Sequence, residues 1–194
     1  MTDDISDRVR LRELKLLSDN HYTLRRAEFD FRRRDGRWQE RDLRESYDLG
    51  DGAAVLPMDR AAGKIILIRQ FRWPAFEWGQ RELLIEAVAG KLDGDDPQTC
   101  VQREAMEEAG VTIRDPRLVT WCFPSPGAVK ERLSLFLADY DAAAPRGQGG
   151  GQVQEGEDIA VLEITLDEGL AMIAKGEIID AKTIILLQAA KLEQ

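Results

Sequence analysis

The most informative stretch of the sequence covers nine residues and reads Arg103-Glu104-Ala105-Met106-Glu107-Glu108-Ala109-Gly110-Val111. Glu107 and Glu108 follow Glu104 by three and four residues, so in a helix the three carboxylates share one face. Like charges at this spacing repel, and two of them also oppose the negative C-terminal end of the helix dipole. The stretch therefore forms either a solvent-exposed acidic face or a site where Mg²⁺ or Mn²⁺ offsets the repulsion.

The residues before this stretch predict how the helix starts. Asp96 is a suitable N-cap and Pro97 fits the first helical position, while Gly110 is suited to end the helix. A loop rich in glycine and carboxylates, residues 90–96, directly precedes the helix. This concentration of acidic groups favours the cation site over the exposed acidic face.

Apolar patterns on either side of the helix predict two domains. Within residues 1–48, three alternating stretches and an Asp35-Gly36 turn predict a small antiparallel β unit, which is too small to be stable alone. Residues 49–194 are expected to form the second domain, where strands and separated helices suggest an α/β or α+β sandwich. The helices after the central one are expected near 167–175 and 181–192. Residues 141–156 are so rich in glycine that we expect a mobile loop that does not pack.

Composition excludes several classes of protein. The 194 residues include 27 Lys and Arg against 36 Asp and Glu, a net charge of −9, which argues against a nucleic-acid partner. His21 is the single histidine, which excludes metal sites with several histidine ligands and argues against Ser–His–Asp catalysis. The two cysteines, Cys100 and Cys122, suggest reduced thiols. Because no apolar run approaches the ~20 residues that span a bilayer, we expect a cytoplasmic protein with no membrane association.

The central stretch, taken together with the loop before it, resembles the Nudix box, G-x5-E-x7-R-E-U-x-E-E-x-G-U, where U is aliphatic. Gly90 opens the box, Asp96 stands where the family has Glu, and the spacer to Arg103 is one residue shorter than usual. The shortened box is similar to that of the GDP-mannose branch of the nucleoside-diphosphate-sugar hydrolases. Further local matches to this branch are residues 17–20, 68–72, 89–90, 125–131 and 180–183.

This resemblance implies a fold and an activity. The fold would be a Nudix-type α/β/α sandwich with a mixed sheet, in a homodimer built partly through the N-terminal strands. The activity would be Mg²⁺-dependent hydrolysis of a nucleotide sugar, GDP-mannose to GMP and mannose 1-phosphate, with Mn²⁺ a possible substitute. Two alternatives stay open: hydrolysis of ADP-ribose to AMP and ribose 5-phosphate, and a Nudix-fold module that binds nucleotide without catalysis.

The resemblance also implies a metal site and a catalytic group. The family's metal ligands fall on the Ala89 carbonyl and on the side chains of Glu104, Glu108 and Glu157. Glu157 is a candidate for ligand or general base, and Glu131 is the competing base. Arg103 is expected to organise Glu107 rather than to contact substrate.

Several substrate-binding residues are expected. Arg72 ends an apolar strand, where a guanidinium suits a phosphate, and Lys182 lies at a helix start, where anions are favoured. The resemblance implies that Arg44 and Glu45 reach the partner's nucleotide across the dimer. It also implies that an aromatic ring stacks on the base, and either ring at positions 21 and 22 is suitable. The full expected set is His21, Tyr22, Arg44, Glu45, Arg72, Gly90, Glu131 and Lys182.

Overall fold

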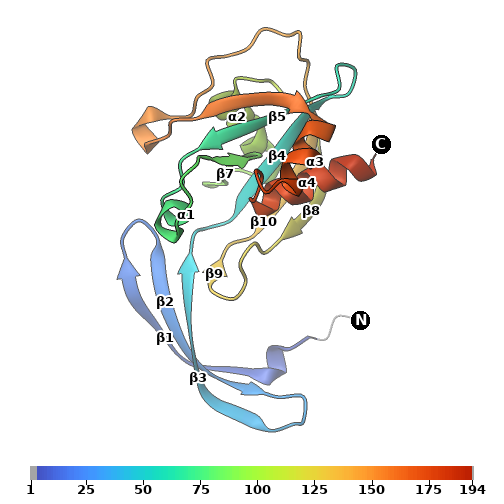
Figure 1. Cartoon of the computed structure of the whole chain (residues 1–194). Helices are drawn as coiled ribbons and strands as arrows, with labels where there is room; N and C mark the ends of the chain where they lie inside the picture. The colour runs from blue at the N-terminus through green and yellow to red at the C-terminus, as the bar shows by residue number, and fades with distance from the viewer. Residues whose placement is uncertain (1–3, 194) are drawn as a thin grey trace. The chain divides into compact units, whose positions relative to one another are not determined.

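The structure, a computed structural model, describes residues 4–193 and divides into two compact units (Figure 1). Among the described residues, the N-terminal unit holds 4–50 together with Phe123–Glu131, and the second unit holds Asp51–Cys122 and 132–193. The division expected after residue 48 did not include the segment 123–131. This segment joins the N-terminal unit because Tyr47 donates a 2.9 Å backbone hydrogen bond to the Ala128 carbonyl.

The N-terminal unit is one four-stranded sheet preceded by a 3-10 turn, Ser6–Arg8. Its first three strands pair antiparallel, as the alternating pattern predicted: β1 (Val9–Asp19), β2 (Thr23–Arg32) and β3 (Trp38–Asp48). The short β9 (Val129–Lys130) adds a parallel pairing to β3. This parallel pair makes the sheet mixed rather than purely antiparallel, as the sequence had predicted it. The sequence did not reveal β9, because a strand of two residues is too short to show an alternating pattern.

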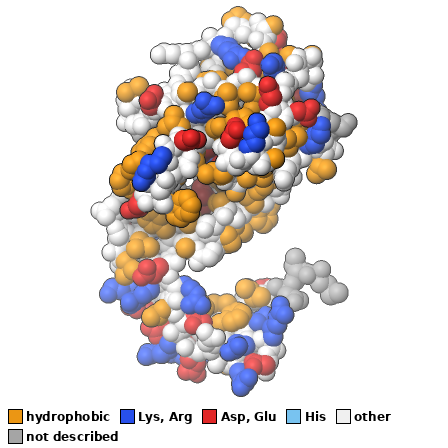
Figure 2. Space-filling view, viewed as in Figure 1, with side chains coloured by type: hydrophobic (Ala, Val, Ile, Leu, Met, Phe, Trp, Pro, Cys, Tyr) orange, Lys and Arg blue, Asp and Glu red, His pale blue; other side chains and the backbone are white. Residues whose placement is uncertain are grey.

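The surface of this unit mixes opposite charges with apolar side chains. Figure 2 shows Lys and Arg side chains interspersed with Asp and Glu over the face that it presents. Arg12 makes a two-point ion pair with the buried Asp30, with nitrogen–oxygen distances of 2.6 and 2.7 Å. The edge strand β1 meanwhile exposes five large apolar side chains, those of Val9, Leu11, Leu14, Leu16 and Leu17.

The second unit is built on a seven-stranded mixed sheet. Five strands follow the order β11-β5-β4-β10-β8, and β10 runs parallel to β4 while the other pairs are antiparallel. Two short strands, β6 and β7, pair with β5 and β4. The bounds are β4 (Gly52–Asp59), β5 (Lys64–Gln70), β6 (Leu84–Glu86), β7 (Val88–Lys91), β8 (Arg114–Cys122), β10 (Leu133–Asp139) and β11 (Ala160–Thr165).

Helices cover both faces of this sheet because its central strands are apolar on both sides. Successive residues of β4 point to opposite faces, so that Val55 enters one core cluster and Leu56 the other. The first cluster is closed by α2 (Pro97–Ala109), and the second by α3 (Leu166–Ala174) and α4 (Ala181–Leu192) (Figure 1). The predicted α/β/α sandwich with a mixed sheet is thereby confirmed.

Helix α2 begins and ends as its sequence predicted. The Asp96 carboxylate accepts backbone hydrogen bonds from Gln98 and Thr99, at 3.0 and 3.2 Å, and Gly110 ends the helix in the left-handed region at φ 67°. Asp96 therefore serves as the N-cap, a position that favours the short Asp side chain.

A short helix that the sequence did not predict, α1 (Trp73–Trp78), follows β5. Its six residues are too few to show helical periodicity, and Pro74 occupies one of its first positions, where proline is tolerated. Trp73 and Trp78 both stay exposed. In the part of the chain that the structure describes, no helix has the length and apolar character needed to cross a bilayer.

The glycine-rich loop contradicts the expectation that it does not pack. A segment that we call the glycine strap, residues 147–151, hydrogen-bonds along the C-terminal end of α2, before the short 3-10 turn Val153–Glu155. Backbone amides of Gly147, Gly150 and Gly151 donate to the carbonyls of residues 110, 108 and 107 at 2.8, 2.9 and 3.0 Å. Glycine makes this possible, because without side chains the two backbones approach closely. The strap thus satisfies carbonyls that a helix end leaves unpaired.

We expect Gly149→Ala to destabilise the protein by about 1–3 kcal/mol, because Gly149 has φ +59° and a Cβ there would lie 3.0 Å from the Ala109 carbonyl carbon. The matched control is Gly63→Ala, where φ is +65° but no atom lies within 4 Å of the added Cβ. Urea unfolding of both variants separates backbone strain from the contact. Equal losses would show that the packing of the strap on α2 contributes nothing to stability.

Candidate active site

Two of the three helix carboxylates are buried. Glu104 is 8% exposed and Glu108 is 1% exposed, since both lie on the side of α2 that packs toward the sheet. The alternative of a solvent-exposed acidic face is therefore wrong for these two residues. Two like charges held this close to an apolar core need compensation from neighbouring groups or from a cation.

The backbone of β7 lies directly against both carboxylates. The Ala89 amide donates a 3.0 Å hydrogen bond to Glu108 Oε2. At the next residue, Gly90, a Cβ atom would lie 1.8 Å from Glu104 Oε1, so no other amino acid fits without moving the glutamate. The glycine that opens the box thus has a steric reason: it leaves room for the Glu104 carboxylate.

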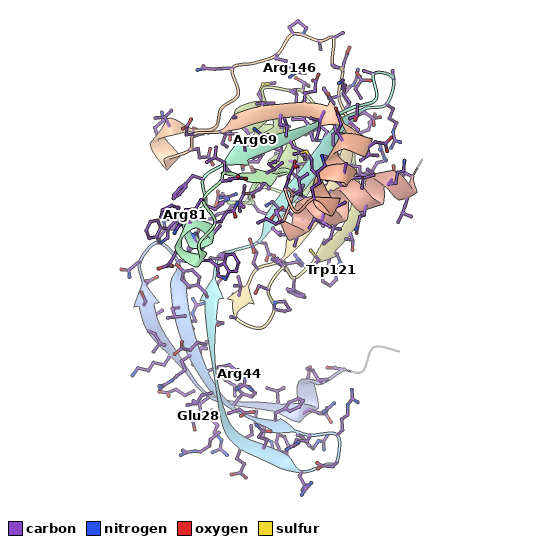
Figure 3. The ribbon with its side chains drawn as sticks, viewed as in Figure 1. Glu28, Arg44, Arg69, Arg81, Trp121 and Arg146 are labelled. Carbon is purple, nitrogen blue, oxygen red and sulfur yellow. The ribbon has the colours of Figure 1, made fainter. Side chains whose placement is uncertain are left out.

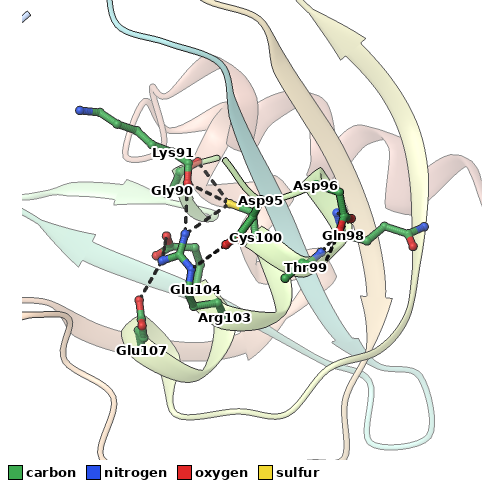
Figure 4. Close-up of polar contacts among 10 residues, drawn as sticks. All are labelled: Gly90, Lys91, Asp95, Asp96, Gln98, Thr99, Cys100, Arg103, Glu104 and Glu107. Carbon is green, nitrogen blue, oxygen red and sulfur yellow. Dashed lines mark hydrogen bonds and ion pairs between the residues drawn. The ribbon is translucent and has the colours of Figure 1, made fainter. Parts of the chain in front are cut away.

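Arg103 binds the carboxylates from the outer side of the helix (Figure 4). Its Nη1 lies 2.7 Å from Glu104 Oε1 and 3.1 Å from Glu107 Oε2, and its Nη2 donates to the Lys91 carbonyl at 3.1 Å. The contact with Glu107 agrees with the prediction, whereas the contact with Glu104 was not predicted. Arg103 therefore links two of the three helix carboxylates to the end of β7.

Burial raises the pKa of both inner carboxyl groups. The pKa of Glu104 rises to about 7, with Glu107 and Glu157 adding to the effect while Arg103 opposes it. The pKa of Glu108 rises to about 8, with Glu104 and Glu157 adding to the effect while the Ala89 amide opposes it. Glu157 is thus close enough for its charge to act on both. In the absence of a cation, the site holds its negative charge at a cost.

The residues fit a hard divalent cation by their chemistry. Mg²⁺ prefers carboxylate and carbonyl oxygens, and the site offers Glu104, Glu108 and the nearby Glu157 beside the Ala89 backbone. Over residues 4–193, no three acidic, imidazole or thiol groups converge into a ready-made cluster. All three carboxylates have partners in the protein. Glu104 pairs with Arg103, Glu108 accepts the hydrogen bond from the Ala89 amide, and Glu157 accepts a 2.8 Å hydrogen bond from the Gln152 amide.

A third buried acid, Glu86 of β6, joins two of the expected substrate-binding residues. Arg72 pairs with both of its carboxylate oxygens, at 2.9 and 3.1 Å, and Lys182 contacts one of them. Sequence reasoning missed Glu86. A charged residue inside the otherwise apolar run from 83 to 89 was the signal that could have found it.

The other expected residues belong to the N-terminal unit. His21 and Tyr22 lie at the β1–β2 connection with ring centroids 4.3 Å apart, and Tyr22 also packs edge-on against Tyr47. Arg44 lies exposed on β3, as Figure 3 shows, and donates to the Leu43 carbonyl at 2.7 Å. Glu45, the next residue on β3, is also exposed. Glu131 is half-buried and directly follows β9.

We expect Mg²⁺ to raise the melting temperature more at pH 8 than at pH 5.5. A carboxyl whose pKa is raised on folding stabilises the protein fully below its unfolded pKa, and this stabilisation is lost as pH rises through 7 and 8. Without metal, stability therefore falls over this range. Mg²⁺ at about a hundred times its Kd would raise the free energy of unfolding by about 2.7 kcal/mol. This corresponds to a rise of roughly 5–10 °C in the melting temperature.

Differential scanning fluorimetry of the wild type and of Glu108→Gln, with Mg²⁺ or EDTA, measures this effect. The variant should lose most of the Mg²⁺ response and be less sensitive to pH in EDTA. A Mg²⁺ response in Glu108→Gln equal to that of the wild type would place the metal elsewhere.

Family models and relatives of known name match this chain over nearly its whole length. Residues 8–47 match the GDP-mannose pyrophosphatase NudK N-terminal domain, and residues 48–186 match the NUDIX domain. The GDP-mannose pyrophosphatase of Pectobacterium atrosepticum is 43% identical, with 96% of this chain and 95% of that protein covered. The one from Cronobacter sakazakii is 43% identical (95% and 95%), and the one from Salmonella typhimurium is 39% identical (94% and 95%).

A solved structure of an ADP compounds hydrolase has the same fold. It superposes with a TM-score of 0.71 and covers 98% of this chain and 95% of its own, at 14% sequence identity. The resemblance drawn from the box residues is confirmed by these matches. With a NUDIX domain over most of its length and relatives that align from end to end, the chain belongs to the Nudix hydrolase family.

Proposed function

We propose that this chain hydrolyses the diphosphate of GDP-mannose and releases GMP and mannose 1-phosphate, with Mg²⁺ as cofactor and Mn²⁺ as a possible substitute. The observation that carries the proposal is the pair of buried carboxylates, Glu104 and Glu108, facing the backbone of Ala89 and Gly90. The choice of GDP-mannose is supported by relatives of that name, which match over both the NUDIX domain and the N-terminal domain. We place the protein in the cytoplasm, which suits the buried thiol of Cys100.

Glu104, Glu108, Glu157 and the Ala89 carbonyl are the proposed metal ligands. Mg²⁺ held by these oxygens would neutralise charge on a diphosphate and lower the pKa of a water molecule. We assign Glu157 as general base or ligand, because its charge acts on both Glu104 and Glu108. Glu131 is the alternative base, and a change in the acidic limb of the pH–rate profile in Glu157→Gln but not in Glu131→Gln would separate them.

Positive charge for the substrate's phosphates comes from Arg72 and Lys182. Both lie in the NUDIX domain near Glu86, and the charges of Arg72 and Glu108 affect each other's pKa. Gly90 would contact the substrate through its backbone, since the space that a side chain would need there is taken by the Glu104 carboxylate.

The N-terminal residues 1–48 are proposed to form a dimerisation subdomain, with residues 49–194 as the hydrolase domain. The exposed leucines of β1 supply an apolar face that a second copy would cover. Arg44 and Glu45 would then contact the nucleotide bound by the partner, and His21 or Tyr22 would stack on its base. Both 44 and 45 are exposed on β3, as this role requires.

The test of the proposed function is incubation of the protein with Mg²⁺ and equal amounts of GDP-mannose and ADP-ribose. We expect GMP and mannose 1-phosphate as the main products by mass spectrometry, and Glu108→Gln should lower turnover at least ~10²-fold without unfolding. AMP and ribose 5-phosphate as the main products would show that ADP-ribose is the preferred substrate. Turnover of neither compound would favour a binding module.

We expect that Arg44→Ala and Glu108→Gln, each poorly active alone, complement each other when mixed. If Arg44 serves the partner's site, a mixed dimer has one complete site and one with both defects. After exchange of subunits, about a quarter of the wild-type activity should return for equal amounts, counting one restored site in half of the dimers. Light scattering should show dimers throughout, and an absence of recovery in mixed dimers would place Arg44 outside the partner's site.

A further inference from the structure

Glu86 is a buried acid to which the proposed mechanism gives no task. It is 1% exposed, ends β6, and lies between the core residues Ile85 and Ala87. A carboxylate at such a position is stable only when its charge is paired and its oxygens are hydrogen-bonded. Two cations provide this pairing, and both are expected substrate-binding residues.

The two cations are held in different ways. Arg72 binds with two nitrogens, Nε to Oε1 at 2.9 Å and Nη2 to Oε2 at 3.1 Å, a two-point geometry that fixes the plane of the guanidinium. Lys182 binds Oε2 and also Asp180 Oδ1, the latter at 3.1 Å. The Lys182 side chain is 11% exposed and the Arg72 side chain 44%. Lys182 is therefore enclosed, whereas Arg72 keeps part of its guanidinium accessible.

The remaining edge of Arg72 is available to a ligand. Glu86 occupies Nε and Nη2, and among residues 4–193 the Nη1 group of Arg72 has no hydrogen-bond partner. Arg72 also lies within electrostatic range of Glu108, since its charge opposes the rise in the pKa of that carboxyl. An arginine fixed on one edge and open on the other loses little freedom when it binds an anion.

We propose that Glu86 is a positioning residue: its two-point ion pair fixes the guanidinium of Arg72, so that the open edge of this group binds the diphosphate of the substrate. Lys182 acts on the other side of Glu86 and balances its charge, with Asp180 as its second partner. The proposal rests on the proposed function only in naming a diphosphate as the ligand. It differs from a structural ion pair, because it requires Glu86 to act on ligand binding through Arg72.

The first experiment is a double-mutant cycle with inorganic pyrophosphate as the probe. Isothermal titration calorimetry in Mg²⁺ buffer measures its Kd for the wild type, Glu86→Gln, Arg72→Lys and the double variant. Lysine keeps the charge of Arg72 but not its two-point geometry. We expect each single change to weaken binding about 10-fold and the double variant to be no weaker than either single one. Additive losses of about 100-fold, or an unchanged Kd in Glu86→Gln, would overturn the proposal.

A second variant removes the effect of an unpaired charge on folding. Glu86→Gln leaves Lys182 buried beside a neutral amide, which destabilises the protein. Combining it with Lys182→Met removes the acid and its enclosed base together, so thermal stability should be closer to that of the wild type. Pyrophosphate binding should stay weaker than the level of Lys182→Met alone. Equal binding by these two variants would show that Glu86 only balances charge.

The matched control is Glu163→Gln on β11, a carboxylate that pairs with Arg146 and does not contact Arg72. Its pyrophosphate Kd should equal that of the wild type, and a comparable loss there would overturn the specific role of Glu86. The cycle also separates the two proposals. A coupled cycle in a protein that turns over neither nucleotide supports the positioning role and refutes the proposed function. Turnover of GDP-mannose together with additive losses in the cycle supports the proposed function and refutes the positioning role of Glu86.

Discussion

The burial of Glu104 and Glu108 on one face of α2 is the constraint on which the arrangement of the NUDIX domain depends. Two carboxylates four residues apart in a largely apolar setting repel each other and lose hydration. Each neighbouring feature relieves part of this cost. The Ala89 amide binds one carboxylate, Arg103 binds the other, and Gly90 gives up its side chain to make room. The remaining cost is what the proposed divalent cation would offset.

The glycine strap connects this helix to the third carboxylate. Its backbone amides donate hydrogen bonds to the carbonyls of residues 107, 108 and 110, at the C-terminal end of α2, which is the negative end of the helix dipole. The next residue, Gln152, precedes the 3-10 turn, and its backbone amide donates a hydrogen bond to Glu157. A Cβ at Gly151 would lie 2.6 Å from Glu157 Oε2, so the strap also leaves space for this side chain. One segment therefore both caps the helix and holds the candidate base within reach of its charges.

Sequence reasoning succeeded where the determining interactions are local. Asp96, Pro97 and Gly110 define the ends of α2 through contacts within a few residues. The first strands of the N-terminal unit are recognisable from the alternation of apolar and polar residues within each strand. It failed where partners lie far apart in the chain. The ion pairs of Glu86 join residues 14 and 96 positions away, and no periodicity marks them. The strap was misjudged because composition describes how flexible glycine is, not how closely it lets two backbones approach.

A comparison of Glu86 with Glu108 shows why one buried acid belongs to the proposed ligand site and the other supports a substrate-binding residue. Glu86 and Glu108 are equally inaccessible, at 1% exposure each. Burial acts to raise the pKa of Glu86, but Lys182 and Arg72 outweigh it and the pKa is lowered. For Glu108, burial dominates and the pKa is raised to about 8, because one amide and a more distant arginine do not balance it. The charge of Glu86 is thus balanced by cationic side chains of the protein itself, whereas that of Glu108 is not, and the proposed metal ion would balance it.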